Sequence, residues 1–184
     1  SFGGHIEVCP ECGDISISYN SCRDRHCPKC QNKEREQWIE FRREEIIPAK
    51  YFHVVFTLPA CLHSIAMANQ REFYDCMFKA AWATIDAFAT KKGLTSGMTA
   101  ILHTWGSNLF YHPHMHCIVP GGGVDMRGVW HHIKGCKRSD FLFPVVAMST
   151  KFRGRFMSLL TRRLKEKGVI IDQSIRKHCF AKAK

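Results

Sequence analysis

The chain has 184 residues, of which 45% are hydrophobic, and a formal net charge of +11 at pH 7. Such a chain suits one domain of ordinary size with a small additional module, and its hydrophobic content excludes wholesale disorder. No apolar run approaches the roughly 20 residues of a membrane span. The 27 Lys and Arg residues outnumber the 16 Asp and Glu residues, which favours a polyanionic partner, most often nucleic acid.

The N-terminus begins SFGGHIEVC, with neither an initiator Met nor a signal peptide, so we expect a protein that has been cut or that starts within a longer one. Five of the ten cysteines lie between Cys9 and Cys30. Without a secretory signal, this clustering favours thiolate metal ligands in a reducing cytoplasm over a disulfide framework. We therefore expect a cytoplasmic protein.

The cysteine-rich segment VCPECGDISISYNSCRDRHCPKC contains two C-x-x-C pairs separated by the strand-like ISISYN. Each pair forms a tight turn that directs two sulfurs into one space, and two such pairs suit tetrahedral zinc. We predict a small zinc-ribbon-like module with the ligands Cys9, Cys12, Cys27 and Cys30. Further candidates, as alternates, neighbours of the ligands or half of a second site, are Cys22, His26 and His5.

A helical pattern follows from Gln31 to Ile47 and ends before Pro48. Its many charged side chains indicate a connecting helix with a solvated face, and contact of its arginines with a phosphate backbone is the alternative. We predict a zinc-binding module with this helix over residues 1–48 and a main domain over residues 49–184.

The main domain begins with the segment FHVVFTL, Phe52–Leu58, which is rich in β-branched and aromatic residues and predicts a buried strand. Apolar residues then recur at intervals of three and four from Leu62 to Phe88, which predicts one long amphipathic helix packed on a sheet. Two more strands are predicted at Thr99–Thr104 and Phe110–Val119, joined by the turn-forming WGSN.

The last part of the chain predicts a hairpin and a basic helix. The hairpin is GVDMRGVWHHI, with its tip near Arg127, and the helix runs from Thr150 to Lys167. Positive charge dominates one face of this helix. A solvated face is the ordinary explanation, and contact with DNA is the alternative, for which the candidates are Arg153, Arg155, Arg162 and Arg163.

Three alternating histidines occupy the strand in FYHPHMHCIVPGGG. In a strand, His112, His114 and His116 project to one face, where two imidazoles can chelate a divalent ion. Histidines also sit in strands for packing reasons, so this pattern alone leaves both interpretations open. The metallo-hydrolase pattern H-x-H-x-D-H is excluded, because Ile118 and Val119 occupy its last two positions. An amidohydrolase barrel is excluded because it needs about 250 residues. A cupin is excluded because it consists almost entirely of strands, whereas at least two long amphipathic helices are predicted here.

The order of these segments resembles that of the HUH endonucleases, named for His, hydrophobic residue, His. The chain has FTLP, then a long helix, then HTWGSNLFYHPHMHCIVPGGG. His114-Met115-His116 matches the HUH motif, and the earlier strand with Phe56-Thr57-Leu58 is similar to the first motif of rolling-circle initiators. With the cysteine module in front, the chain is similar to insertion-sequence transposases that act by single-stranded, rolling-circle-like transfer. The similarity extends from Gly3 to about Lys167.

This resemblance implies an α+β fold: a ferredoxin-like HUH domain with a central antiparallel sheet, helices on one side and the two motif strands adjacent in the middle. It implies structural zinc and a catalytic Mg or Mn ion that polarises the scissile phosphate. The expected ligands of this Mg or Mn ion are His114 and His116. For the third ligand, His103 is the first choice and His112 the second. The expected partner is DNA, in the form of single-stranded transposon ends.

The family nicks and transfers a DNA strand through a 5′-phosphotyrosine, formed by a tyrosine on a helix downstream of the motif. All four tyrosines of this chain precede His114, and Tyr111 beside the motif is expected to be a packing residue. We therefore expect that this chain contains no nucleophile and that its HUH domain is truncated before the tyrosine segment. Whether the chain alone is an enzyme stays open at this point. The rival interpretations are a non-catalytic zinc-ribbon DNA-binding module and a metal nuclease that uses water.

Overall fold

The chain divides into two compact units, Ser1–Pro48 and Ala49–Lys184, each of which is described here by itself. The structure is a computed structural model, and it describes residues 3–22, 24, 27, 30–133 and 141–180.

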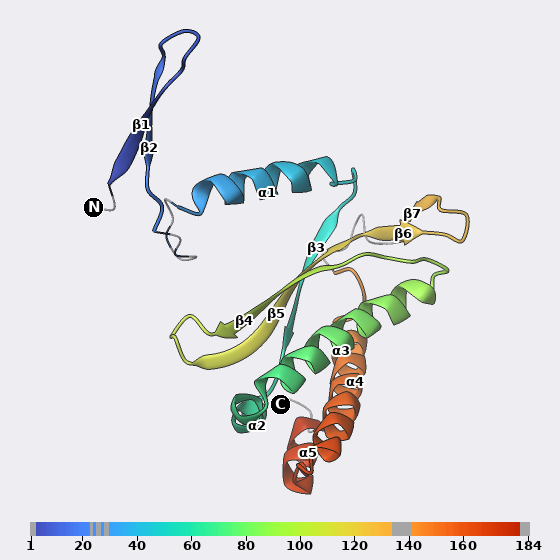
Figure 1. Ribbon diagram of the computed structural model, residues 1–184. Helices are drawn as coiled ribbons and strands as arrows, with labels where there is room; N and C mark the ends of the chain where they lie inside the picture. Colours follow the sequence, from blue (N-terminus) through green and yellow to red (C-terminus); the bar gives the residue numbers. More distant parts are fainter. Residues whose placement is uncertain (1–2, 23, 25–26, 28–29, 134–140, 181–184) are drawn as a thin grey trace. The chain divides into compact units, whose positions relative to one another are not determined.

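The N-terminal unit consists of a hairpin and a helix (Figure 1). The antiparallel strands are β1 (Gly4–Val8) and β2 (Ile15–Tyr19), and the helix is α1 (Asn32–Glu44). The structure thus adds β1 to the strand expected at ISISYN. No described residue of this unit is buried. Hydrophobic burial therefore contributes little to its folding, as expected for a module that a bound metal ion stabilises.

The C-terminal unit is built on a three-stranded antiparallel sheet with the order β3-β5-β4. These strands are β3 (Tyr51–Thr57), β4 (Thr99–Trp105) and β5 (Tyr111–Pro120). The prediction of an α+β fold with a central antiparallel sheet is confirmed. The two motif strands, β3 and β5, are adjacent as expected, with β5 in the centre and β3 at an edge of the described sheet. A smaller hairpin, β6 (Gly122–Val124) and β7 (Trp130–His132), occurs where the sequence predicts one.

One face of the sheet is covered by helices (Figure 1). Phe56 of β3 packs against Phe152 of α4 (Val145–Glu166), with ring centroids 4.5 Å apart. Phe156 of α4 meets Phe73 of α3 (Gln70–Thr90) at 5.1 Å. Both pairs belong to one core that includes the inward side chains of β5. The expected arrangement, with the helices on one side of the sheet, is therefore present.

The helix expected from Leu62 to Phe88 is interrupted. The structure has a 3-10 turn η1 (Ala60–Leu62), a short helix α2 (His63–Ala68) and then α3. Asn69 separates α2 from α3 with φ −138° and ψ 47°, which lies outside the helical region, and its side-chain amide donates a hydrogen bond to the Ile65 carbonyl oxygen. The apolar spacing continues across this break, so periodicity alone gave one helix where there are two.

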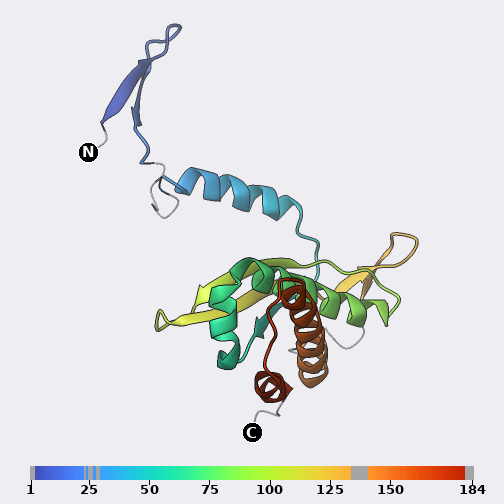
Figure 2. The ribbon, with the colours of Figure 1, turned by 60° about the horizontal axis from the view of Figure 1, so that its bottom comes forward.

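Two differences occur near the C-terminus. Helix α4 begins directly after Pro144, five residues before the predicted start at Thr150. A further helix, α5 (Gln173–Phe180), had not been predicted. A loop connects it to the end of α4 (Figure 2). It contacts η1 and α4, and its Cys179 Sγ is 3.6 Å from Cys61 Sγ of η1. Among the helices of the described ranges, none has the length and hydropathy needed to cross a membrane.

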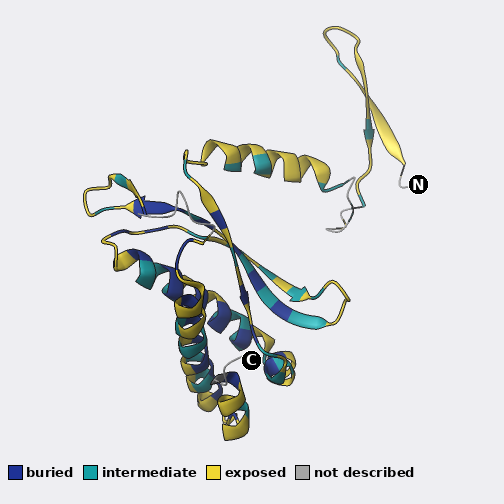
Figure 3. Ribbon diagram, turned by 180° about the vertical axis from the view of Figure 1, so that it is seen from behind, coloured by how far each residue is buried: buried dark blue, intermediate teal, exposed yellow. Residues whose placement is uncertain are grey.

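The other face of the sheet is open. Buried positions alternate with half-buried or exposed ones along β3 and β5 (Figure 3), and Val55, Ile101 and Ile118 on this face are exposed. Alternation of this kind is expected where one face of an antiparallel sheet packs on a core and the other meets solvent. The histidines of β5 lie on the open face.

We predict that Phe156→Ala lowers the free energy of unfolding by about 3–5 kcal/mol, because its fully buried ring contacts Phe73 and Phe152 and the cavity left behind cannot collapse fully. Denaturant unfolding followed by circular dichroism measures this change. Val146→Ala in the same helix is the control, because Val146 is 81% exposed and its truncation is expected to change stability by no more than about 0.5 kcal/mol. Equal effects of the two substitutions would contradict the described core.

Candidate metal centre

The central strand β5 separates its side chains into a core set and an open set. Met115, Cys117 and Val119 have no solvent exposure and lie in the core. His114 and His116 are half-buried and point to the opposite face, as the two-residue period of a strand requires. The strand thus uses its apolar side for packing and presents its imidazoles on the open face.

A third histidine comes from the neighbouring strand. His103 of β4 lies directly opposite His114 in the antiparallel register. Its ring centroid is 5.4 Å from that of His114 and 4.5 Å from that of His116. One nitrogen from each of the three rings lies within 4.8 Å of the others. The structure therefore brings together the three histidines that were predicted to hold the divalent ion.

Hydrogen bonds determine which nitrogens can face a metal. Nδ1 of His114 is 2.7 Å from the backbone carbonyl oxygen of His112, and it must donate because a carbonyl oxygen only accepts. Nε2 of His114 is then the atom with a free lone pair. Ligating histidines commonly donate their other ring N–H in this way. Nδ1 of His116 is likewise engaged, at 2.7 Å from Nε2 of His53 on β3.

His112, the second choice for the third ligand, lies beside this group. Its ring centroid is 5.3 Å from that of His114 and 5.7 Å from that of His63 at the start of α2. Burial lowers the pKa of His63, and the nearby His112 adds to the effect. His112 is outside the three-histidine group, and its backbone carbonyl orients His114.

The donor set limits which ion fits. Within the described residues the group contains three imidazoles and no carboxylate, and no residue of β3, β4 or β5 is acidic. Imidazole nitrogens suit divalent transition metals, whereas Mg²⁺ prefers oxygen ligands and keeps several waters. The residues present therefore fit a divalent transition ion whose remaining positions are open to water or substrate oxygens.

Tyr111 is held away from the histidine group as a structural residue. Its hydroxyl oxygen is 2.9 Å from that of Tyr74 on α3. Burial, reinforced by this hydrogen bond, raises the pKa of Tyr111 well above its ordinary value. A phenol that is held neutral and paired is a poor nucleophile. The arrangement agrees with the expectation that Tyr111 is a packing residue.

In the N-terminal unit a different trio of cysteines is brought together. The sulfurs of Cys22, Cys27 and Cys30 lie within 4.8 Å of one another, with Cys22 Sγ 3.2 Å from Cys30 Sγ. A hydrogen bond from Ser21, followed by those from Cys22, lowers the pKa of Cys30 to about 6. This lowering favours the thiolate form of Cys30, the form that binds zinc.

The other predicted zinc ligands lie elsewhere in this unit. Cys9 and Cys12 are beside the β1–β2 turn, which the pair Val8–Ile15 closes, whereas Cys22 follows the opposite end of the hairpin. Backbone hydrogen bonds from Cys12 and Glu11 lower the pKa of Cys9. His5 on β1 pairs with Glu7 at 3.2 Å. His26 lies outside the described residues.

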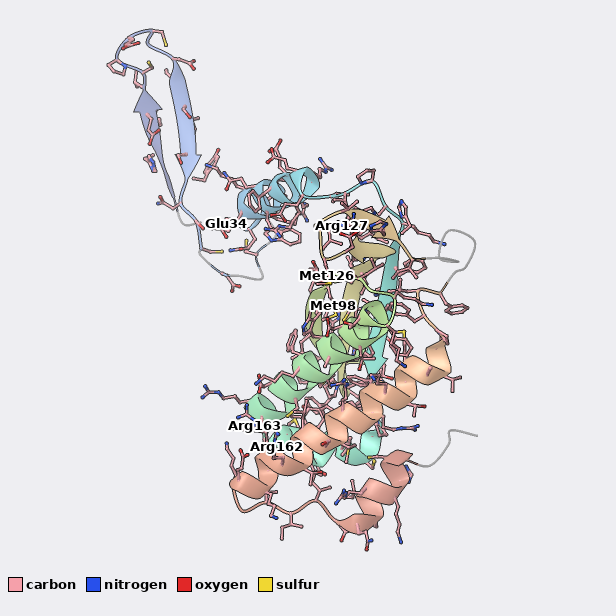
Figure 4. The ribbon with its side chains drawn as sticks, turned by 90° about the vertical axis from the view of Figure 1, so that its right-hand side faces the viewer. Glu34, Met98, Met126, Arg127, Arg162 and Arg163 are labelled. Atoms are coloured by element: carbon pink, nitrogen blue, oxygen red, sulfur yellow. The ribbon has the colours of Figure 1, made fainter. Side chains whose placement is uncertain are left out.

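The basic residues predicted to contact DNA lie on α4, in the helical layer on the far side of the sheet from the histidines. Arg163 is 3.4 Å from Asp75 of α3, so part of this charge stabilises the packing of α4 on α3. Figure 4 shows Arg162 and Arg163 near the end of α4, alongside α3. Arg155 and Arg162 are exposed and, seven residues apart, share one helix face. The structure thus keeps these arginines apart from the candidate metal centre.

Two family models match the chain: a transposase zinc-binding domain over residues 1–58 and a putative transposase over residues 97–183. The putative transposase y4qJ of Sinorhizobium fredii (strain NBRC 101917 / NGR234) is 46% identical over 166 residues, covering 88% of this chain and 41% of that protein. The chain belongs to the transposases of insertion sequences. The prediction of this family from the sequence is confirmed.

A second relative of this transposase chain is the transposase for insertion sequence element IS801 of Pseudomonas savastanoi pv. phaseolicola. It is 35% identical over 122 residues, covering 66% of this chain and 30% of that protein. The chain thus spans less than half the length of both curated relatives. Among solved structures, a metal-bound complex of the conjugative relaxase TrwC with oriT DNA has a TM-score of 0.46 and 11% identity, covering 60% of this chain and 43% of that chain.

We predict that Cys22→Ser weakens zinc binding at least tenfold, because Cys22 supplies one of the three clustered sulfurs. Competition with a chromophoric chelator measures the affinity. Cys61→Ser is the control, because Cys61 belongs to the other unit. If Cys9→Ser and Cys12→Ser abolish zinc binding and Cys22→Ser leaves it unchanged, the two-pair ligand set predicted from spacing is right and the clustered trio is not the site.

We also predict that His116 titrates below pH 6.5 in the metal-free protein. Burial, and then the neighbouring imidazoles of His103, His114 and His53, disfavour its protonated form and lower its pKa. NMR titration of the His116 ring measures the midpoint. His103→Ala removes one neighbouring charge and should raise it. A midpoint at or above 6.5 in the unsubstituted protein would show that the rings are not packed as described.

Proposed function

We propose that this chain binds single-stranded DNA on the open face of its sheet, beside a divalent ion held by His103, His114 and His116, and that it is the metal- and DNA-binding part of a transposase that nicks and transfers a DNA strand. The observation that carries the proposal is the group of three imidazole nitrogens within 4.8 Å of one another on that face. Histidines buried for packing would instead lie among the core side chains.

In this proposal His114 and His116 present Nε2 to the ion from one strand, while His103 completes the group from the next. When bound, the ion polarises a phosphate oxygen and stabilises the charge that develops during strand cleavage. The all-imidazole donor set favours Mn²⁺ over Mg²⁺. The rigid sheet holds the three rings in place, so little reorganisation is needed for metal or DNA to bind.

Charge and exposed aromatic rings support DNA as the partner. The net charge is +11, and the three strands of the sheet carry no acidic residue that would repel phosphate. At the β4–β5 turn, Trp105 and Phe110 are 60% and 72% exposed. Exposed aromatic side chains can stack on unpaired bases, which favours single-stranded over double-stranded DNA.

We further propose that the nucleophilic tyrosine, which forms the 5′-phosphotyrosine, belongs to the part of the whole transposase that this chain does not span. Tyr111 is paired with Tyr74 and held neutral, and no tyrosine follows His116. Zinc in the N-terminal unit has a structural role in this proposal. Arg155 and Arg162 contact the phosphate backbone of DNA on the helical side, away from the metal.

The experiment that tests the proposal measures Mn²⁺ affinity and single-stranded DNA affinity together. Protein that carries one equivalent of zinc on its cysteine thiolates should bind Mn²⁺ at one weak site, and His114→Ala should abolish this binding because only two imidazoles remain. His132→Ala, which removes an exposed histidine outside the group, is the control. Mn²⁺ should strengthen binding of a fluorescent single strand in the control and leave His114→Ala unaffected. A His114→Ala variant that still binds Mn²⁺ favours the non-catalytic DNA-binding module.

We predict that the 184-residue chain forms no covalent adduct with a suicide single-stranded DNA substrate in the presence of Mn²⁺, because its tyrosines precede the motif and Tyr111 is sequestered. Denaturing gel electrophoresis detects the adduct. A shifted protein–DNA band would place the nucleophile within this chain, and Tyr→Phe substitutions would identify it. DNA cleavage without attached protein would instead support the water-using nuclease.

A further inference from the structure

A fourth histidine contacts the group from a strand that is distant in sequence. Strands β3 and β5 are antiparallel, with Val55 opposite His116 and His53 opposite Ile118. His53 and Val55 lie on the same face because they are two residues apart. His53 is therefore the diagonal neighbour of His116 on the open face, close enough for two long side chains to touch.

The contact between the two rings is specific. Nε2 of His53 is 2.7 Å from Nδ1 of His116, and the two rings lie nearly parallel and edge to edge, with centroids 4.9 Å apart and an interplanar angle of 11°. A hydrogen bond between two neutral imidazoles requires one nitrogen to donate and the other to accept. The only question is which ring carries the shared proton.

Metal ligation by His116 requires one direction of this hydrogen bond. Nδ1 of His116 is taken by His53, so the atom left for an ion near His103 and His114 is Nε2. That atom needs a free lone pair, which places the proton on Nδ1 of His116. His116 then donates to Nε2 of His53, whose own proton lies on Nδ1. His114 is arranged in the same way by the carbonyl oxygen of His112.

From this geometry we infer that His53 is a positioning residue, which accepts the Nδ1–H of His116 and so fixes that ring in the tautomer and orientation needed for metal ligation. This inference rests on the proposed metal site. In this inference His53 of β3 accepts the Nδ1–H of His116, just as the backbone carbonyl of His112 accepts the Nδ1–H of His114. His53 itself does not touch the ion.

The consequence is a ligand that is oriented before the ion arrives. Loss of the partner that accepts a ligating histidine's other N–H typically costs about 10–100-fold in metal affinity. His53→Phe keeps an aromatic ring beside His116 but removes the acceptor nitrogen. His53→Gln replaces it with an amide oxygen that can accept the same N–H.

The first measurement is Mn²⁺ affinity by electron paramagnetic resonance, with protein that carries one equivalent of zinc on its cysteine thiolates. We expect the dissociation constant to rise about 10–100-fold in His53→Phe and to recover in part in His53→Gln. His132→Phe, an equivalent substitution at an exposed histidine on β7, should have no effect. Unchanged affinity in His53→Phe, with wild-type binding that His114→Ala abolishes, would overturn the inference and leave the proposed function intact.

The second measurement needs no metal. Nitrogen-15 NMR of the metal-free protein should find His116 as the Nδ1–H tautomer in the wild type and as a mixture of tautomers in His53→Phe. A wild-type His116 protonated on Nε2 would overturn the inference. Absence of Mn²⁺ binding in the wild type would refute the proposed function, and the tautomer would still decide whether His53 orients His116. If His53→Phe fails to fold, His53→Gln and the wild-type tautomer remain as tests.

Discussion

The candidate metal centre depends on the two-residue period of β5. One side of this strand is fixed by the burial of Met115, Cys117 and Val119 against the helical layer. A shift of one residue in register would move those side chains to solvent and carry the histidines into the core, where unpaired polar groups are costly. The apolar core and the histidine group are therefore two sides of one constraint. The ligand histidines are therefore held by strands of the sheet and not by a loop.

Features that depend on local pattern could be predicted from the sequence, and features that depend on pairing between distant segments could not. Alternation along β5 places His114 and His116 on one face without any knowledge of the fold. The contact of His53 with His116 could not be predicted, because it depends on the register of β3 against β5. The two histidines are 63 positions apart in the sequence. The break at Asn69 was missed because neither Pro nor Gly marks it and the apolar spacing continues across it. Helix α5 is too short for periodicity to distinguish it from a loop.

The N-terminal unit shows the same limit in the arrangement of its cysteines. The C-x-x-C spacing indicates which sulfurs share a turn, but not how far one turn lies from the next. A ladder of five residue pairs separates the turn beside Cys9 and Cys12 from Cys22. At about 3.4 Å per residue, such a ladder places its two ends too far apart for one zinc ion. Cys22 has no partner three residues away, so spacing alone gave it a lower rank than the structure does.

The absence of acidic residues from the sheet gives the open face an unusual electrostatic character. Metal sites built from carboxylates are negative when empty and nearly neutral when filled. Three uncharged imidazoles neutralise nothing, so a divalent cation seated there keeps its full double charge, next to a surface that offers no counter-ion of its own. The missing negative charge must come from whatever approaches the sheet. In the proposed function this charge comes from the phosphate backbone of the DNA strand to be cut. Binding of the cation should therefore raise the affinity for DNA, and binding of DNA should raise the affinity for the cation.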